Sequence, residues 1–201
     1  AEGPRFSIVI RTHNRAGLLR GALQSVANQT YQNFEVIVME DGAPTAQKML
    51  EQEFSHLPLT YRATGENVGR SRAGNLGLSL ATGQYLNFLD DDDYFYPDHL
   101  EQMAAQAQSS PEADLLLGCS VSLFTDGDST KPEVRASARY TLVRFDRLDV
   151  FTMSQMCQIP LLSVAFKKEL FQQLGGLHEG MDAHEDWAMW LKYLAKARRA
   201  H

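Results

Sequence analysis

The chain has 201 residues, enough for one ordinary domain, and its 44% hydrophobic and 22% charged residues are the balance of a soluble globular protein with a core. The formal net charge of −6 disfavours nucleic-acid binding, which normally needs a basic face. No apolar run approaches the roughly 20 residues of a membrane-spanning helix. We therefore expect neither a nucleic-acid-binding protein nor a membrane span in this chain.

The two cysteines, Cys119 and Cys157, lie in or beside apolar segments. We expect buried core thiols, because two cysteines are too few for a disulfide framework. This favours a cytoplasmic location, at most peripheral to the inner face of a membrane. The start of the chain lacks the basic and apolar parts of a signal peptide. The abrupt basic end at residues 196–201 suggests a piece of a longer protein.

Strand and helix patterns alternate through the first half, which predicts a mostly parallel sheet with helices on both faces. The expected strands cover residues 6–10, 34–39, 59–62 and 85–89, the third being weak and edge-like. The expected helices are 18–26 with Asn14 as its cap, 45–54 with Thr45 as its cap, one carrying Ala73, Leu76, Leu80 and Ala81 that stops at Gly83, and one that begins at Pro97.

The pattern after Ser110 is less regular and is interpreted as an extension of the same domain. Strands are expected over 115–123, 139–144 and 163–166, and a turn-rich loop over 125–129. A short helix is expected over 168–174. A last helix should run from about Glu185 to Ala197, with Trp187, Leu191 and Leu194 facing inward.

Polar clusters follow three of the predicted strands, at residues 11–14, 40–42 and 90–93. In open sheets of this kind, ligands bind outside the carboxyl ends of the strands. Three polar strand ends at one edge of the sheet therefore predict a binding site there.

The third cluster consists of four consecutive aspartates, Asp90 to Asp93, directly after a buried strand. Carboxylates held at the edge of an apolar core need a counter-charge, which Mg²⁺ or Mn²⁺ can supply together with substrate phosphates. On an extended backbone Asp90 and Asp92 would point one way and Asp91 and Asp93 the other, so only some can be ligands. A calcium loop is rejected because Phe95 occupies the position that requires glycine.

Nine segments, in this order and spacing, resemble the large inverting family two of GT-A-fold glycosyltransferases, the nucleotide-diphospho-sugar transferases. They are SIVIRTHNR (7–15), QTYQNFEVIV (29–38), EDG (40–42), ENVG (66–69), AGNLG (73–77), ATGQY (81–85), LDDDD (89–93), GGL (175–177) and EDW (185–187). Each segment is weak alone, but together they span nearly the whole chain. The resemblance implies an α/β GT-A fold with a Rossmann-like sheet.

The resemblance also implies roles for individual residues. Thr12 and Asp41 would line the nucleobase pocket, and Asp91 would lie near the donor ribose. Arg70 or Arg72 would contact the donor, because many members have arginine at the position of Gly74. The donor-binding set is then Thr12, Asn14, Asp41, Arg70, Arg72, Asp90 and Asp91. The direct metal ligand would be Asp92, the catalytic base Asp186, and the acceptor-side residues His184, Glu185 and Trp187.

The expected activity is metal-dependent transfer of a sugar, with inversion, from a UDP-linked donor to a saccharide or glycolipid acceptor in polysaccharide or glycoconjugate synthesis. Residues 1–110 would be the donor half and residues 111–201 the acceptor half of one domain. A nucleotidyltransferase that acts on a sugar phosphate and a non-catalytic nucleotide-binding module are the alternatives. On spacing alone, Glu185 and Asp186 are ordinary acids of a first helical turn. The sugar, the linkage and the oligomeric state stay open.

Overall fold

The computed structural model describes residues 3–126, 135–143, 150–155, 159–181 and 183–197. In the first half the elements are β1 (Phe6–Thr12), α1 (Ala16–Ala27), β2 (Phe34–Glu40), α2 (Gln47–Glu53), β3 (Leu59–Ala63), α3 (Arg70–Leu80), β4 (Tyr85–Asp90) and α4 (His99–Ser109). In the second half they are β5 (Leu115–Leu117), β6 (Ser120–Asp126), β7 (Arg135–Val143), α5 (Val150–Gln155), the 3-10 turn η1 (Leu161–Ser163), β8 (Val164–Lys167), α6 (Lys168–Leu174) and α7 (Glu185–Leu194).

The main sheet has the strand order β3-β2-β1-β4-β8-β5. Strands β1 to β4 are parallel to one another, and β8 is antiparallel to both β4 and β5. Strands β6 and β7 form a separate antiparallel pair. The expected mostly parallel sheet is confirmed, and β3 is at its edge as predicted.

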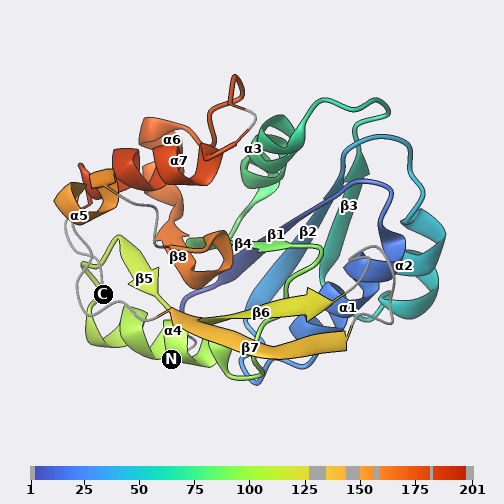
Figure 1. Cartoon of the computed structure of the whole chain (residues 1–201), viewed down its shortest axis with the longest axis horizontal. Coiled ribbons are helices and arrows are strands. Elements are labelled where there is room, and N and C mark those ends of the chain that lie inside the picture. Colours follow the sequence, from blue (N-terminus) through green and yellow to red (C-terminus); the bar gives the residue numbers. More distant parts are fainter. Residues whose placement is uncertain (1–2, 127–134, 144–149, 156–158, 182, 198–201) are drawn as a thin grey trace.

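Helices cover both faces of this sheet, because its central strands are apolar on both sides. In β1, Ile8 and Ile10 pack into one core cluster with α1, α2 and α4, whereas Val9 packs into the other with α3, α5, α6 and α7. Figure 1 shows α1, α2 and α4 below the sheet and α3, α6 and α7 above it. The carboxyl ends of β1, β2 and β4 therefore meet at one edge, between the helical layers.

Both predicted helix caps are wrong. Arg15, not Asn14, precedes α1, and Asn14 has a left-handed φ of 53°. Helix α2 is preceded by Ala46, and its N-terminal end is held by the buried carboxylate of Glu40, which accepts a hydrogen bond from Ala46 N at 3.0 Å. Thr45 donates its hydroxyl to the same carboxylate. A buried carboxylate at the end of β2 thus takes the role predicted for Thr45.

Helix α3 does not bury all of the apolar residues that predicted it. Leu76 and Leu80 are exposed, and the buried face is built instead from small residues. At Gly77 a Cβ atom would lie only 2.5 Å from Val9, and at Gly74 it would lie 2.9 Å from Leu177. The two glycines let α3 approach the sheet closely, which brings its N-terminal residue toward the polar edge.

The expected strand over 115–123 is divided in two. At Gly118 the backbone N–H donates to Ser163 O at 2.8 Å, and the chain then leaves the main sheet to begin β6. Cys119 follows directly and is exposed, so its prediction as a buried thiol is wrong. Cys157 lies outside the described residues. A glycine within a strand pattern is the signal for such a break.

The last helix packs its strongest apolar side chains on the main sheet. Trp190 and Tyr193 are fully buried, and Trp190 meets Phe166 of β8 edge to face at 5.9 Å. The predicted inward residues Trp187, Leu191 and Leu194 are only partly buried and pack at the margin of this cluster. The helix is therefore rotated from the predicted orientation, with Met189, Trp190 and Tyr193 as its core face.

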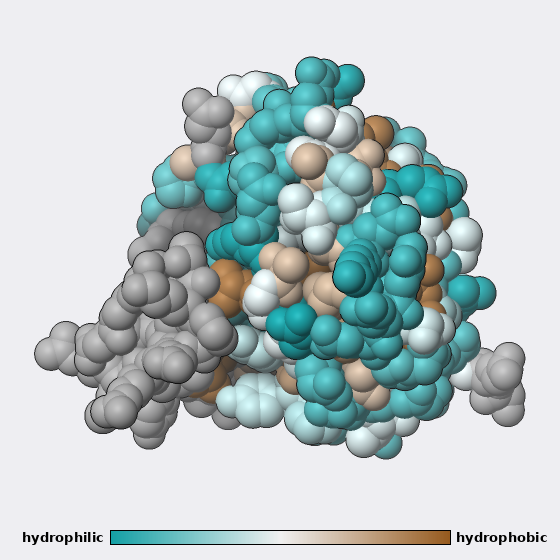
Figure 2. Space-filling model, turned by 90° about the vertical axis from the view of Figure 1, so that its right-hand side faces the viewer, coloured by the Kyte–Doolittle hydropathy of each residue, from teal (hydrophilic) through white to brown (hydrophobic). Residues whose placement is uncertain are grey.

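The surface over α2 and β3 is mostly hydrophilic, with scattered apolar residues, as Figure 2 shows. None of the helices in the described part of the chain has the length and apolar character of a membrane span.

Glu35 provides a test of the fold on the side of the sheet opposite the polar edge. Burial alone would raise the pKa of its carboxyl group, but hydrogen bonds from Ser7 and Thr82 and the charge of Arg5 lower it overall. A lowered pKa stabilises the fold above the ordinary carboxyl value, and this stability is lost as pH falls through the folded-state pKa. We expect Glu35→Gln to cost about 1–2 kcal/mol at pH 7 and progressively less toward pH 3, measured by urea unfolding.

The exposed Glu66→Gln variant is the matched control for Glu35, and it should leave the free energy of unfolding unchanged. A Glu35→Gln protein that loses the same stability at pH 3 as at pH 7 would contradict this account of the carboxylate.

Candidate active site

The acidic run after β4 is a turn rather than an extended segment. Asp93 N donates to Asp90 O at 3.0 Å, which closes the turn. The predicted alternation of the four side chains is therefore wrong. Asp91 is fully buried, whereas the side chain of Asp92 is 46% exposed. The turn leaves Asp92 as the most accessible carboxylate of the run.

The buried Asp91 is held by β1 and the segment after it. Thr12 donates its hydroxyl to Asp91 Oδ2 at 2.7 Å, and Arg15 Nε donates to the same oxygen at 3.0 Å. Burial raises the pKa of Asp91, although Thr12 and Arg15 act in the opposite direction. Arg15 also reaches Asp92 at 3.2 Å. Thr12 and Asp91 thus meet at the predicted donor edge, with an arginine that the sequence interpretation did not assign.

The chemistry of this edge fits a divalent cation that is bound mainly through its substrate. Burial, followed by the charges of the three neighbouring aspartates, raises the pKa of Asp93 to about 7. Among the described residues, no cluster of three or more His, Cys, Asp or Glu side chains could enclose a metal ion. Mg²⁺ sites that use one or two carboxylates with substrate phosphates do not need such a cluster.

Asp41 lies at the end of β2 and is buried. Its two carboxylate oxygens accept hydrogen bonds from Val68 N at 2.7 Å and Gly69 N at 3.0 Å. Gly69 has a φ of 90°, which favours glycine, and it directly precedes α3. Asp41 therefore fixes the loop that leads into α3 beside the donor edge. Its predicted contact with a nucleobase stays a prediction.

The other side of the site is the N-terminal turn of α7. His184 precedes this helix with a left-handed φ of 62°, and its exposed ring meets the edge of Trp187 at 5.8 Å. Glu185 is buried, and its Oε1 lies 3.2 Å from Arg70 Nε and 3.5 Å from Arg11 Nη1. Glu185 thus faces inward, toward two arginines from β1 and α3.

Asp186 is half-buried, and its Oδ1 accepts a hydrogen bond from Trp187 N at 2.7 Å. It lines a pocket of about 270 Å³ together with Asp90, Arg11 and Arg70. The structure therefore brings the predicted catalytic residue beside the first residue of the acidic run, although they come from opposite ends of the chain. Trp187 points away from this pocket and donates its indole N–H to Met153 O.

Arg11 joins the two sides, and the sequence interpretation assigned it no role. It is buried, donates to Asp90 Oδ1 from Nε at 2.9 Å and from Nη2 at 2.6 Å, and faces Glu185. Burial alone would lower its pKa, but Asp90 and Glu185 raise it overall. An arginine among polar residues after a strand is the available signal, but its partners cannot be identified from spacing. Arg72, in contrast, is exposed on α3.

We expect Arg11→Met to lower the free energy of unfolding by about 3 kcal/mol, because it leaves Asp90 and Glu185 without their shared buried cation. The Arg11→Met/Glu185→Gln double variant should recover part of this loss, because the buried carboxylate of Glu185 is removed together with the charge of Arg11. Urea unfolding of the three proteins, with the exposed Arg72→Met as control, measures the coupling. Strictly additive losses would show that Arg11 and Glu185 do not interact.

Taken together, the fold and this edge define an α/β domain with a mostly parallel sheet, with polar residues gathered beyond β1, β2 and β4, where such sheets bind ligands. The model of the family described as glycosyl transferase family 2 matches residues 7–174. The chain therefore belongs to glycosyl transferase family 2. This confirms the family that the sequence motifs resemble.

Individual relatives agree with this assignment. An uncharacterized glycosyltransferase of Rickettsia typhi is 26% identical over 195 residues, covering 95% of this chain and 59% of that protein. S. aureus TarS 1-349 in complex with UDP-GlcNAc is similar with a TM-score of 0.75 and 21% identity, over 98% of this chain and 55% of that one. A mannosyltransferase of Pyrobaculum calidifontis, in complex with GDP-Man and Mn²⁺, has a TM-score of 0.63 and 20% identity, over 91% and 51%.

The two structural similarities confirm the GT-A type of α/β fold. The chain spans about three fifths of the length of three curated relatives, the Rickettsia typhi protein among them.

Proposed function

We propose that this chain transfers a sugar from a nucleotide diphospho-sugar to an acceptor hydroxyl group, with a divalent metal and with inversion at the anomeric carbon. The observation that carries the proposal is the shared pocket of Asp90 and Asp186. A glycosyl transfer needs a donor diphosphate site and a base for the acceptor in the same place. The family of the chain and the two nucleotide-sugar complexes of similar fold support the reaction class.

The donor is proposed to lie along the carboxyl ends of β2, β1 and β4. Thr12 and Asp41 would border the nucleobase, and Asp91 would border the ribose. Asp92 would hold Mn²⁺ or Mg²⁺ together with the donor phosphates, because it is the most exposed carboxylate of the run. Arg70 at the start of α3, whose side chain is 56% exposed and pairs with Glu185, lines the same pocket as Asp90 and is the proposed arginine for a donor phosphate.

Asp186 is proposed as the base. It lies in the first turn of α7 and lines the same pocket as Asp90. The acceptor hydroxyl would pass its proton to Asp186 while its oxygen bonds to the anomeric carbon, and the bond from that carbon to the diphosphate breaks. Attack from the face opposite the leaving group gives inversion. The metal, when bound, neutralises the charge that develops on the leaving diphosphate.

We also propose roles for the two halves of the chain, and the nature of the donor nucleotide and the acceptor. Residues 1–110 would form the donor half and residues 111–201 the acceptor half of one domain. UDP is the proposed nucleotide of the donor. The proposed acceptor is a saccharide or glycolipid in polysaccharide or glycoconjugate synthesis. Such an enzyme would work in the cytoplasm, at or near the inner face of a membrane.

A thermal-shift screen of UDP, GDP, CDP and dTDP, each with Mn²⁺ or with EDTA, tests donor binding. A ligand at 100 times its Kd should raise the Tm of a domain of this size by about 5 °C or more. We expect this shift with Mn²⁺ for at least one nucleotide and its loss with EDTA. An unchanged Tm with all four nucleotides and metal would refute the proposed function.

A further inference from the structure

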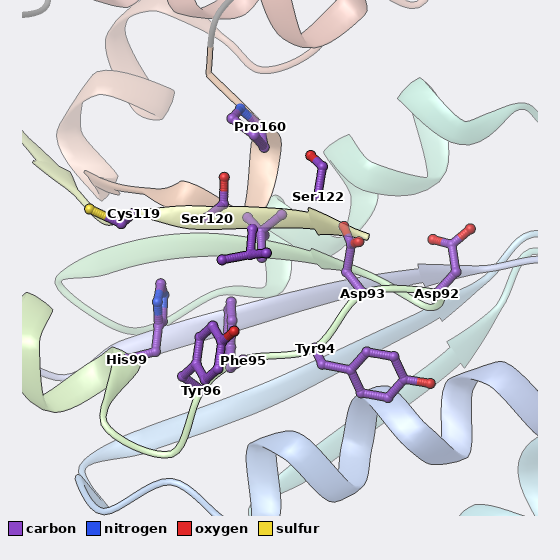
Figure 3. A pocket seen from close by; sticks show the side chains of 12 residues that line it. Asp92, Asp93, Tyr94, Phe95, Tyr96, His99, Cys119, Ser120, Ser122 and Pro160 are labelled. Carbon is purple, nitrogen blue, oxygen red and sulfur yellow. The ribbon is translucent and has the colours of Figure 1, made fainter. Parts of the chain in front are cut away.

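A second cavity adjoins the acidic run on its other side and has a volume of about 540 Å³. Its walls are the loop between β4 and α4, the start of β6, and the residues on either side of Leu161. In Figure 3, Asp92 and Asp93 lie toward one end of this pocket, and Cys119 and His99 lie toward the other. We call it the β6 pocket. The family motifs give it no role.

One wall of the β6 pocket is aromatic and rigid. The Phe95 ring stacks on His99 at a centroid distance of 4.0 Å, and His99 Nε2 is 2.9 Å from Asn87 Oδ1. Burial lowers the pKa of His99 to about 4, so this wall carries no charge at neutral pH. Tyr96, with its side chain 62% exposed, stands beside it at the open part of the pocket. A flat apolar surface with a polar tip is therefore available to a ligand.

The start of β6 adds hydroxyl groups to the same pocket. Ser122 lines it, and so does Ser120, which is 6% exposed. The buried Oγ of Ser120 has no hydrogen-bond partner within the described part of the chain. Because this Oγ has almost no accessible surface, a ligand in the pocket cannot reach it. The exposed Ser122 is therefore the hydroxyl group of β6 that the pocket offers to a ligand.

The β6 pocket is adjacent to the pocket of Asp186. Leu161 lines the pocket of Asp186, and its two neighbours Pro160 and Leu162 line the β6 pocket. The acidic run divides in the same way, with Asp90 on the Asp186 side and Asp92 on the β6 side. The two pockets are therefore neighbours, one on each side of the acidic run.

We propose that the β6 pocket binds a sugar ring of the acceptor saccharide, with Tyr96 against the ring face and Ser122 near its hydroxyl groups. A sugar ring combines an apolar C–H face with a rim of hydroxyls, which suits a pocket with an aromatic wall and an exposed serine. The volume lies within the roughly 300–1,000 Å³ of small-molecule sites. The far end reaches the exposed Cys119, which suits an acceptor that continues into solvent.

This inference rests on the proposed glycosyl transfer, and Cys119 makes it testable apart from that function. The probes are the p-nitrophenyl glycosides of glucose, galactose, N-acetylglucosamine and mannose. Their binding to the protein with UDP and Mg²⁺ is followed by saturation-transfer NMR, before and after treatment with N-ethylmaleimide. The Cys119→Ser protein is treated in parallel, so that any effect of a reagent adduct on Cys157 appears in both proteins.

We expect at least one glycoside to bind, its signal to vanish after N-ethylmaleimide treatment, and the same signal to survive treatment in Cys119→Ser. UDP binding should persist in every sample. A glycoside signal that survives alkylation, or no glycoside binding by a protein that binds UDP, would overturn the proposal. Absence of binding of UDP, together with an unchanged Tm for GDP, CDP and dTDP, would instead refute the proposed function.

A second variant, Tyr96→Ala, separates the acceptor from the donor sugar. We expect the affinity for the bound glycoside to fall roughly 3- to 10-fold, with the affinities for UDP and for the UDP-sugar unchanged. A weaker UDP-sugar affinity with unchanged UDP affinity would assign the pocket to the donor sugar, and this result would also overturn the proposal.

Discussion

Replacing Asp92 by asparagine should abolish the metal-dependent stabilisation by nucleoside diphosphate. Arg15 pairs with Asp92 as well as with Asp91, but Asp92 is the most exposed carboxylate of the run and therefore the one most available to a cation. An amide lacks the charge that a hard divalent ion requires. We expect the affinity for UDP with Mn²⁺ to fall at least about 100-fold, which titration calorimetry can measure.

Asp98→Asn is the matched control, because Asp98 is an exposed aspartate in the loop that follows the same run. It should bind the nucleotide and metal with wild-type affinity. If Asp92→Asn also keeps the wild-type affinity, Asp92 is not the metal ligand and the donor edge has been assigned wrongly.

Replacing Asp186 by asparagine should lower kcat by about 10²- to 10⁴-fold and leave the KM of the donor nearly unchanged. The amide oxygen can still accept the hydrogen bond from Trp187 N, so the start of α7 should keep its structure. The amide cannot accept the proton of the acceptor hydroxyl. Steady-state rates of transfer, with donor and acceptor varied separately, measure both constants.

The exposed Glu179→Gln on the segment before α7 is the control for Asp186, and its kcat should equal that of the wild type. A variant Asp186→Asn with full kcat would exclude Asp186 as the base. If the wild-type domain binds nucleotide but transfers no sugar from any donor to any acceptor, this result would favour the non-catalytic module.

Most of the fold could be predicted because its local signals agree with one another. The apolar runs of β1, β2 and β4 are each followed by polar residues, and a parallel sheet brings such ends to one edge. The same regularity placed Thr12 beside Asp91 and the acidic run within the site. The pairing of Asp90 with Asp186 in one pocket followed from the family resemblance, since helical spacing alone gave Asp186 no special role.

The errors arise where tertiary contacts outweigh local preference. Glu40 took the capping role of Thr45 because it is buried at the end of β2 and needs donors. The close packing of Gly77 on Val9 decided the buried face of α3, which an apolar pattern cannot reveal. The hydrogen bond from Gly118 to Ser163, far along the chain, separated β5 from β6 and left Cys119 exposed.

The arginines show a further limit of sequence interpretation. Arg11 and Arg15 lie in the first polar cluster, yet their partners are carboxylates that come from β4, the turn after it and α7. Such pairs depend on the register of distant strands and helices. Their consequence is structural as well as electrostatic, because Arg11 connects the donor edge with the start of α7 through Asp90 and Glu185.

Product analysis with a nucleotide-sugar donor tests the central claim most directly. The chain is incubated with a panel of UDP-, GDP- and dTDP-sugars and glycoside acceptors, in Mn²⁺ or in EDTA, and the nucleotide products are separated by chromatography. The account predicts release of a nucleoside diphosphate together with a glycosylated acceptor, in Mn²⁺ only. Formation of a nucleoside triphosphate and a sugar phosphate on adding pyrophosphate, with no nucleoside diphosphate from any donor, would contradict it and identify a nucleotidyltransferase.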